Sequence, residues 1–358
     1  MKPADDLRFG VLLTVNRHAG QSDGDALARA VAVAQAAEAL GLDDVWLTEH
    51  HFLPSAVSPS AMAFAAFLLG RTRRVRIGTA VTVLPLHSPV HIAEQTALLD
   101  QISGGRFVLG VGRGVPGVEY ELMGEGIAAW HAGLAEPLDR TLAALHGEIP
   151  RGPGPSASVP VRLAPAVRTR PHPPVYVAAG SVDSIELAAD RGLPLMLFFD
   201  KNAEAKAEML ALYGRRARAA GQQPEPGSGH AFAVFAQVTD SAAEARRLMR
   251  ERARFILSLN NQPQRLVDPD RPAPPPLTGE AIDLVVDRLM TTHPVGTART
   301  CAERLAHDIA TSGCRRVMCQ VEAAEGTAEA LHNLRRLATE VFPAVRERLR
   351  TRAARVAV

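Results

Sequence analysis

Cysteine, lysine and long hydrophobic runs are all scarce in this sequence of 358 residues. Its three cysteines, an odd number without paired short spacings, argue against a disulfide framework and against a zinc site. No uninterrupted run reaches the roughly 18 apolar residues of a transmembrane helix. The first residues also lack the apolar stretch of a secretory signal peptide. We therefore expect a soluble protein of the cytoplasm.

An excess of charge of one sign is missing as well. The formal net charge is only +2, and the 40 basic residues, of which three are lysines, are interleaved with acidic ones. This balance gives no electrostatic reason to expect nucleic acid or an anionic membrane as a partner. Hydrophobic residues make up 47% of the chain, which is enough to bury one large core.

The chain alternates short β-rich runs with longer helical runs. The β-rich runs predict strands at 8–13, 44–48, 75–83, 106–111, 175–179, 194–198, 231–238 and 315–321. Apolar spacings of three and four predict helices at 23–40, 59–70, 90–102, 131–147, 182–192, 201–221, 240–258, 297–313 and 327–352. Several strands are apolar on both faces, which is typical of parallel strands covered by helices. Eight strand–helix units predict an α/β protein with one (β/α)8 TIM barrel over residues 1–358, rather than an open doubly wound sheet.

Two long irregular segments interrupt this alternation. Residues 149–174 are rich in proline, glycine and serine, and we expect an extended loop with a short hairpin there. Residues 258–279 carry six prolines and no periodicity. This second segment follows the seventh predicted strand and would emerge on the face where barrel enzymes have their active sites, so we expect a mobile lid loop.

Several histidines lie at positions suited to chemistry. His50 and His51 end the second predicted strand, at the mouth of the barrel, where an imidazole would serve as general base or hydrogen-bond donor. Adjacent residues on a strand face opposite ways, which argues against a two-histidine metal site. His87 and His91 straddle a helix start and no third ligand follows, so we expect no metal there either. The alternative to a catalytic role is that His50 and His51 are both structural.

Two glycine-containing stretches suggest phosphate binding. Residues 112–117 match G-x-G-x-x-G after the fourth strand, a weak sign of a dinucleotide site. Alternatively, Gly112 and Gly114 let the backbone approach a flat ligand while Arg113 neutralises a phosphate. After the fifth strand, a phosphate would face the start of a helix and a small set of residues there: Gly180, Ser181 and Ser184. An ordinary serine N-cap is the other interpretation of this second stretch.

In combination these segments resemble the bacterial luciferase family of flavin-dependent monooxygenases, and most of all its alpha subunits. The resemblance rests on AEALGLDDVWLTEHHF (37–52), LLGRT (68–72), HSPVHIAEQTALLDQISGGRF (87–107) and GVGRG (110–114). It continues more loosely through PVYVAAGS (174–181) and weakens from about residue 200.

The resemblance implies roles for individual residues. The first histidine of the family's E-H-H run lies at the flavin and is needed for catalysis, which indicates His50. The arginine of the glycine-rich run binds the flavin phosphate, which indicates Arg113. Three residues of the turn after strand five would complete that phosphate site: Gly180, Ser181 and Ser184. A non-prolyl cis peptide under the isoalloxazine corresponds to Ala80–Val81.

The sequence also departs from the family. The reactive cysteine that precedes the arginine in luciferase is replaced by Gly112, and a second phosphate-binding arginine aligns near His131. We therefore expect flavin binding without light emission. The glycine is expected to leave room beside the ring for a substrate bulkier than a linear aldehyde.

The resemblance implies an enzyme of the two-component type. It would take reduced FMN from a separate reductase, form a flavin C4a-(hydro)peroxide with O2, and oxidise a small organic substrate, with a place in secondary metabolism. The alternatives are an oxidoreductase that uses the deazaflavin F420 and a non-catalytic flavin-binding protein. The family also implies a homodimer, for which the apolar faces of 59–70 (Met62, Phe64, Phe67 and Leu68) and of 90–102 are candidates; the alternative is that these faces pack on the barrel.

Overall fold

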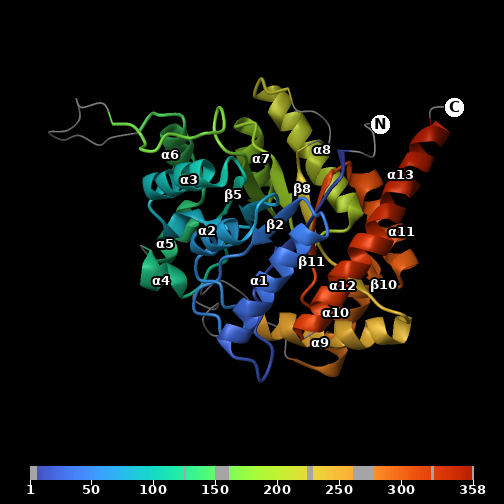
Figure 1. Cartoon of the computed structure of the whole chain (residues 1–358). Coiled ribbons are helices and arrows are strands. Elements are labelled where there is room, and N and C mark those ends of the chain that lie inside the picture. The colour runs from blue at the N-terminus through green and yellow to red at the C-terminus, as the bar shows by residue number, and fades with distance from the viewer. Residues whose placement is uncertain are drawn as a thin grey trace.

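The computed structural model describes residues 6–124, 126–149, 161–223, 229–260, 277–323 and 326–356. Within these ranges it confirms the predicted closed parallel barrel (Figure 1). The eight barrel strands are β1 (Arg8–Leu13), β2 (Asp44–Leu47), β3 (Arg76–Thr79), β5 (Phe107–Gly112), β6 (Val175–Ala179), β7 (Leu195–Leu197), β8 (Ala231–Phe235) and β11 (Arg316–Gln320). They follow the order β3-β2-β1-β11-β8-β7-β6-β5, and the pairing of β3 with β5 closes the ring.

Helices surround the barrel (Figure 1). Eight of them match predicted ones: α1 (Asp23–Ala39), α2 (Ala61–Arg71), α3 (Pro89–Ser103), α6 (Ala135–Leu145), α7 (Val182–Asp190), α8 (Ala203–Ala219), α9 (Ala242–Asn260) and α11 (Ala298–Ser312). The predicted C-terminal helix consists of α12 (Thr327–Arg336), a π-helical segment (Leu337–Val341) and α13 (Phe342–Val356). Three further helices are α4 (Glu119–Met123), α5 (Ile127–Ala132) and α10 (Gly279–Thr292).

Local sequence signals set several helix boundaries. Ser22 caps α1 through a capping box with Asp25, which satisfies backbone N–H groups that have no partner within the helix. Gly104 ends α3 in the left-handed conformation, with φ of 69°, which a residue without a side chain adopts at little cost. These signals set the residue at which α1 begins and the residue at which α3 ends.

Two predicted strands are each divided. Predicted strand 75–83 consists of β3 and β4 (Thr82–Val83), with Ala80 and Val81 between them. Predicted strand 231–238 consists of β8 and β9 (Gln237–Val238), and β9 pairs with β10 (Val295–Gly296) in a separate two-stranded sheet. Both interruptions lie at the carboxyl ends of barrel strands, and only the second moves the chain into a separate sheet.

Side chains fill the barrel, so its interior is a packed core. Buried interior residues include Leu12, Trp46, Val108, Tyr176, Met196 and Met318. A larger apolar layer lies between the strands and the surrounding helices. Of the residues proposed for a dimer interface, Met62 and Leu68 belong to this layer, so these two pack on the barrel, as the alternative prediction had it. Phe67, in contrast, is 45% exposed.

One ion pair is buried between two of the outer helices. Lys206 of α8 lies 2.8 Å from a carboxylate oxygen of Asp308 on α11, and their side chains are 0% and 8% exposed. The ammonium group also lies 4.4 Å from the centre of the Phe232 ring. Burial raises the pKa of Asp308, and the positive charge of Lys206 opposes this shift. The pair therefore ties α8 to α11 in a region that excludes water.

The two irregular segments are described only in part. The described portion of the first, 161–174, contains no strand, and most of the rest of that segment lies outside the described residues. In the second, 258–260 complete α9 and Gly279 begins α10, while the expected lid at 261–276 lies outside the described residues. Among the described helices, none has the length and apolarity required to cross a membrane.

Candidate active site

The predicted site residues lie at one rim of the barrel. His50 follows β2, Ala80 and Val81 follow β3, and Arg113 follows β5. The stretch from Gly180 to Ser184 follows β6. Because the barrel strands are parallel, their carboxyl ends share the same rim, where barrel enzymes have their active sites. The fold therefore brings residues more than 130 positions apart to one end of the molecule.

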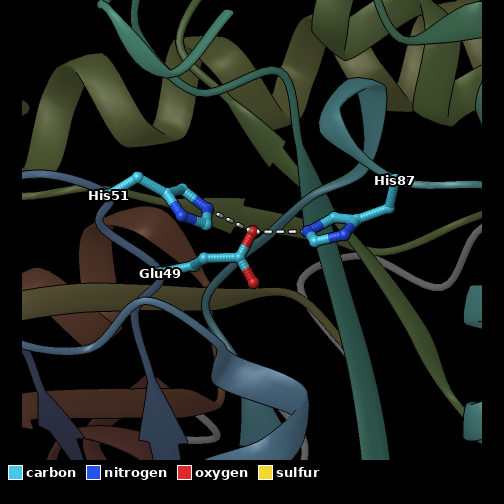
Figure 2. A group of neighbouring side chains, drawn as sticks. All are labelled: Glu49, His51 and His87. Carbon is cyan, nitrogen blue, oxygen red and sulfur yellow. Dashed lines mark hydrogen bonds and ion pairs between the residues drawn. The ribbon is translucent and has the colours of Figure 1, made fainter. Parts of the chain in front are cut away.

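Glu49, which follows β2, is the buried centre of a cluster with the buried His51 and the half-buried His87 (Figure 2). Its Oε1 lies 2.8 Å from His87 Nε2 and 3.4 Å from His51 Nε2, and it accepts the Val83 N–H at 3.1 Å. The other carboxylate oxygen accepts the Ala61 N–H at 3.3 Å. One carboxylate thus joins the end of β2, the start of α2 and the segment that follows β3.

These hydrogen bonds also fix the charge of Glu49. Burial raises the pKa of Glu49, but hydrogen bonds from His51, His87 and the Val83 N–H outweigh it and lower this pKa to about 2. The carboxylate is therefore ionised at neutral pH and acts as an acceptor. Its neighbour in sequence, His50, is half-buried and donates its backbone N–H to the Ser58 carbonyl at 2.9 Å.

The same cluster corrects part of the reasoning that led us to predict no metal site at His87. The sequence suggested that His87 has no further ligands, yet one oxygen of Glu49 and one nitrogen each of His51 and His87 lie within 4.8 Å of one another. His51 lies beyond the end of β2, where strand alternation no longer applies, and His87 comes from a distant segment. A carboxylate with two imidazoles is a donor set that transition metals accept. The hydrogen bonds already account for the cluster, and the absence of a metal stays a prediction.

The peptide between Ala80 and Val81 is cis, as predicted. The Ala80 N–H donates to the Leu47 carbonyl at 2.6 Å, which connects this peptide to the end of β2. Val81 also corrects the expectation about Gly112. A Cβ atom at Gly112 would lie 2.7 Å from Val81 Cγ2 and 3.1 Å from the Ala178 Cβ. The space beside Gly112 is therefore filled by protein, and the expected extra room for substrate is not there.

Arg113 is held by an aromatic residue that the sequence analysis missed. Its guanidinium carbon lies 3.9 Å from the centre of the Trp130 ring, and the Arg113 side chain is exposed. The Trp130 indole N–H donates to the Gly114 carbonyl at 3.4 Å, and the Tyr120 hydroxyl donates to the Arg113 carbonyl. This stacking orients the guanidinium and leaves its charge available to an anion.

The turn after β6 forms a serine N-cap. Ser181 caps α7, and the Ser184 hydroxyl oxygen accepts the N–H groups of Gly180 and Ser181 at 3.2 and 3.1 Å. The N-cap interpretation of the sequence is thus correct, and phosphate binding at this turn stays a prediction. A Cβ at Gly180 would meet no atom within 4 Å, so the fold itself does not need a glycine there. The exposed helix start nevertheless offers the positive end of its dipole to an anion.

A family model described as luciferase-like monooxygenase matches residues 7–316. The chain belongs to this family. The alkanal monooxygenase alpha chain of the Kryptophanaron alfredi symbiont is 27% identical over 96% of this chain and 99% of that protein. The oxygenase component of the flavin-dependent trigonelline monooxygenase of Acinetobacter baylyi is 31% identical over 52% of each chain. The protein is accordingly an oxidoreductase of the flavin-dependent luciferase-like monooxygenases.

Solved structures of the luciferase-like fold agree with the barrel. A monooxygenase of Streptomyces bottropensis superimposes with a TM-score of 0.76 at 25% identity, covering 94% of this chain and 99% of that one. The oxygenating constituent of 3,6-diketocamphane monooxygenase of Pseudomonas putida, a complex with FMN, gives 0.75 at 20% identity and covers 95% and 98%. An F420-dependent secondary alcohol dehydrogenase gives 0.71 at 20% identity and covers 95% and 99%. The last two similarities show the fold alone.

Proposed function

We propose that this luciferase-like protein is the oxygenase component of a two-component monooxygenase. It takes reduced FMN from a separate reductase and uses O2 to oxidise a small organic substrate. The observation that carries the proposal is the arrangement of Arg113 on Trp130, at the same rim as His50 and the N-cap of α7. The name of the Acinetobacter relative, an oxygenase component, supports the two-component arrangement.

The residues at this rim suit the phosphate of FMN. A phosphate monoester carries close to two negative charges at neutral pH, and a guanidinium binds it through charge-assisted hydrogen bonds. Arg113 supplies this group in an exposed, pre-oriented position. The N-terminus of α7 supplies backbone N–H groups and the hydroxyls of Ser181 and Ser184.

The remaining residues act on the reacting end of the site. Reduced flavin, when bound, supplies the electrons that activate O2. His50 holds or transfers a proton there, because an imidazole changes its charge near neutral pH. The buried side chains of Ala80 and Val81 present an apolar surface beside it, and this surface excludes water.

Charge reversal at the phosphate site tests the proposal. The Arg113→Glu variant is expected to bind FMN and reduced FMN at least about 100-fold more weakly, because a charge-assisted bond is lost and repulsion replaces it. Isothermal titration of FMN into each protein measures the effect. Arg215→Glu, which alters an exposed arginine on the outside of α8, is the matched control and should change nothing. Equal FMN affinity in the Arg113→Glu variant and the native chain would refute this phosphate site.

The oxygen reaction gives an independent test. Mixing the protein, reduced FMN and O2 in a stopped-flow instrument should change the rate of flavin reoxidation relative to free reduced FMN. The same titration with F420 decides the alternative, which the fold of the F420-dependent dehydrogenase supports. Tighter binding of F420 than of FMN, with an unchanged rate of flavin reoxidation, would favour the F420 enzyme.

We also propose a homodimer that forms through α2 and α3. Phe67 of α2 and Leu98 and Ile102 of α3 are 45%, 46% and 65% exposed, and the two helices contact each other. Apolar side chains grouped on a surface in this way favour association. Light scattering should give twice the chain mass of 38.2 kDa, and Ile102→Arg should shift the protein to the monomer. A native chain that is monomeric at micromolar concentration would contradict the proposal.

A further inference from the structure

The rim of the barrel has two halves. The proposed cofactor residues follow β2, β3, β5 and β6, which form one continuous part of the ring. The other half consists of the ends of β7, β8, β11 and β1. In Figure 1, α9 and α10 lie together across the lower end of the barrel, near the start of α1. The second half is therefore covered by different helices and lined by different residues from the half that holds the proposed cofactor site.

Arg252 of α9 is an unusual residue in this second half. The residue is 5% exposed, and its Nε and Nη1 have no hydrogen-bond partner among the described residues. Its guanidinium carbon lies 4.8 Å from the ring centres of Phe235, at the end of β8, and of Phe255. Burial lowers the pKa of Arg252 to about 10, against the attraction of Glu322, so the side chain remains a cation at neutral pH.

The carboxylate near Arg252 is already used by other groups. Glu322, which follows β11 and is fully buried, accepts the Thr14 N–H at 2.9 Å. It also pairs with Arg29 at 3.9 Å. Among the described residues, the charge of Glu322 acts on both guanidinium groups, but the carboxylate forms its ion pair with Arg29 and not with Arg252. A buried charge without a full set of hydrogen bonds destabilises a protein, so its retention calls for a reason.

Further hydrogen-bonding groups lie near these two guanidinium groups: the Asn16 carbonyl accepts from Arg29, and the centre of the His18 ring lies 6.2 Å from that of Phe255. Asn16 Nδ2 and His18 Nε2, both in the segment after β1, are buried atoms without a hydrogen-bond partner in the described part of the chain. Burial and the positive charges of Arg29 and Arg252 lower the pKa of His18 to about 4, so its imidazole is neutral. His18 also lines an open hollow of about 190 Å³ at the surface, together with Arg17, Ala19, Gly20, Pro54 and Ser55.

We propose that Arg252, with Asn16 and His18, binds the carboxylate of an organic substrate on the half of the rim that lies across from the phosphate site. The rings of Phe235 and Phe255 lie beside the guanidinium and suit an aromatic or apolar body attached to that carboxylate. This inference rests on the function proposed above, because it assigns the substrate class of the same barrel mouth. Arg252 thereby determines specificity, since uncharged analogues would leave its charge unpaired.

A binding experiment with matched probes tests the inference. Fluorine NMR of 4-fluorobenzoate and 4-fluorobenzamide, titrated with the full chain in the absence of flavin, compares a carboxylate with an uncharged molecule of the same shape. The carboxylate should bind at least about tenfold more tightly, and Arg252→Met should remove this preference. Arg252→Lys should keep part of it, and Arg254→Met, which alters an exposed arginine of the same helix, should leave it intact.

The outcomes separate the alternatives. Equal binding of both probes, no binding of the carboxylate, or unchanged binding by Arg252→Met would overturn the inference. Competition by acetate as strong as that by benzoate would mean a site for free anions, and this too would overturn it. Because flavin is absent, a negative result leaves the FMN proposal standing, and loss of FMN binding leaves this result valid.

Stability provides a second measurement that needs no ligand. If Arg252 serves binding, Arg252→Met removes an uncompensated buried charge and should raise the melting temperature by roughly 2 °C or more. If the residue serves the fold through its two aromatic contacts, the same substitution should lower the melting temperature. A lower melting temperature together with unchanged probe binding would assign Arg252 to structure alone.

Discussion

Replacement of His50 by alanine is expected to lower product formation by about 10²–10⁴-fold, the usual contribution of a general acid or base. The affinity for FMN should change much less, because the proposed phosphate contacts lie after β5 and β6 and not after β2. The effect should therefore fall on kcat, measured with reduced FMN, O2 and any substrate that the native protein accepts. Isothermal titration of FMN in parallel shows whether the cofactor still binds.

His91→Ala is the matched control for this substitution. His91 is an exposed histidine at the start of α3, where its imidazole lies 3.1 Å from the amide nitrogen of Gln95. Its loss should leave both turnover and FMN binding unchanged. If His50→Ala kept native turnover, His50 would have no role in proton transfer, and its imidazole would be structural.

Asp308→Ala is expected to lower the free energy of unfolding by about 3–5 kcal/mol, because it leaves the Lys206 ammonium buried without its counter-charge. The side chain of Lys206 is 0% exposed, so water cannot replace the lost carboxylate without movement of α8 or α11. Urea denaturation followed by circular dichroism measures the change.

The double variant Lys206→Met with Asp308→Leu provides the comparison. Removal of both charges replaces the ion pair by apolar groups of similar size, and such exchanges are often neutral or stabilising. We expect the double variant to be more stable than Asp308→Ala alone. A loss as large in the double variant as in the single one would show that packing, and not the unpaired charge, dominates at this position.

The barrel was predictable because its signals are local. Each strand is a short apolar run, and caps such as Ser22 and Gly104 mark helix boundaries within a few residues. Helix α10 was missed, although Thr278 caps it, because the proline-rich run before it hid its start. The pairing of β9 with β10 was missed because it joins residues nearly 60 positions apart, and no local pattern indicates such a contact.

The candidate site was likewise predictable where its residues lie in contiguous motifs, and not where it depends on contacts between distant residues. Arg113 and His50 stand in contiguous motifs, so the sequence alone pointed to them. The cluster around Glu49 was not found, because its partners Val83 and His87 lie 34 and 38 positions away. The stacking of Arg113 on Trp130 depends on how the chain returns to the rim after β5, which composition and periodicity do not determine.

The chain contains two tryptophans, and their surroundings differ. Trp46 is buried inside the barrel, edge-on to Tyr176 with ring centres 5.4 Å apart. Trp130 lies against the Arg113 guanidinium at the rim. The fluorescence of Trp46 therefore reports on the integrity of the barrel interior. The fluorescence of Trp130 responds to an anion that binds the neighbouring Arg113 guanidinium. The protein thus carries two built-in optical probes, and Trp130→Phe separates their signals.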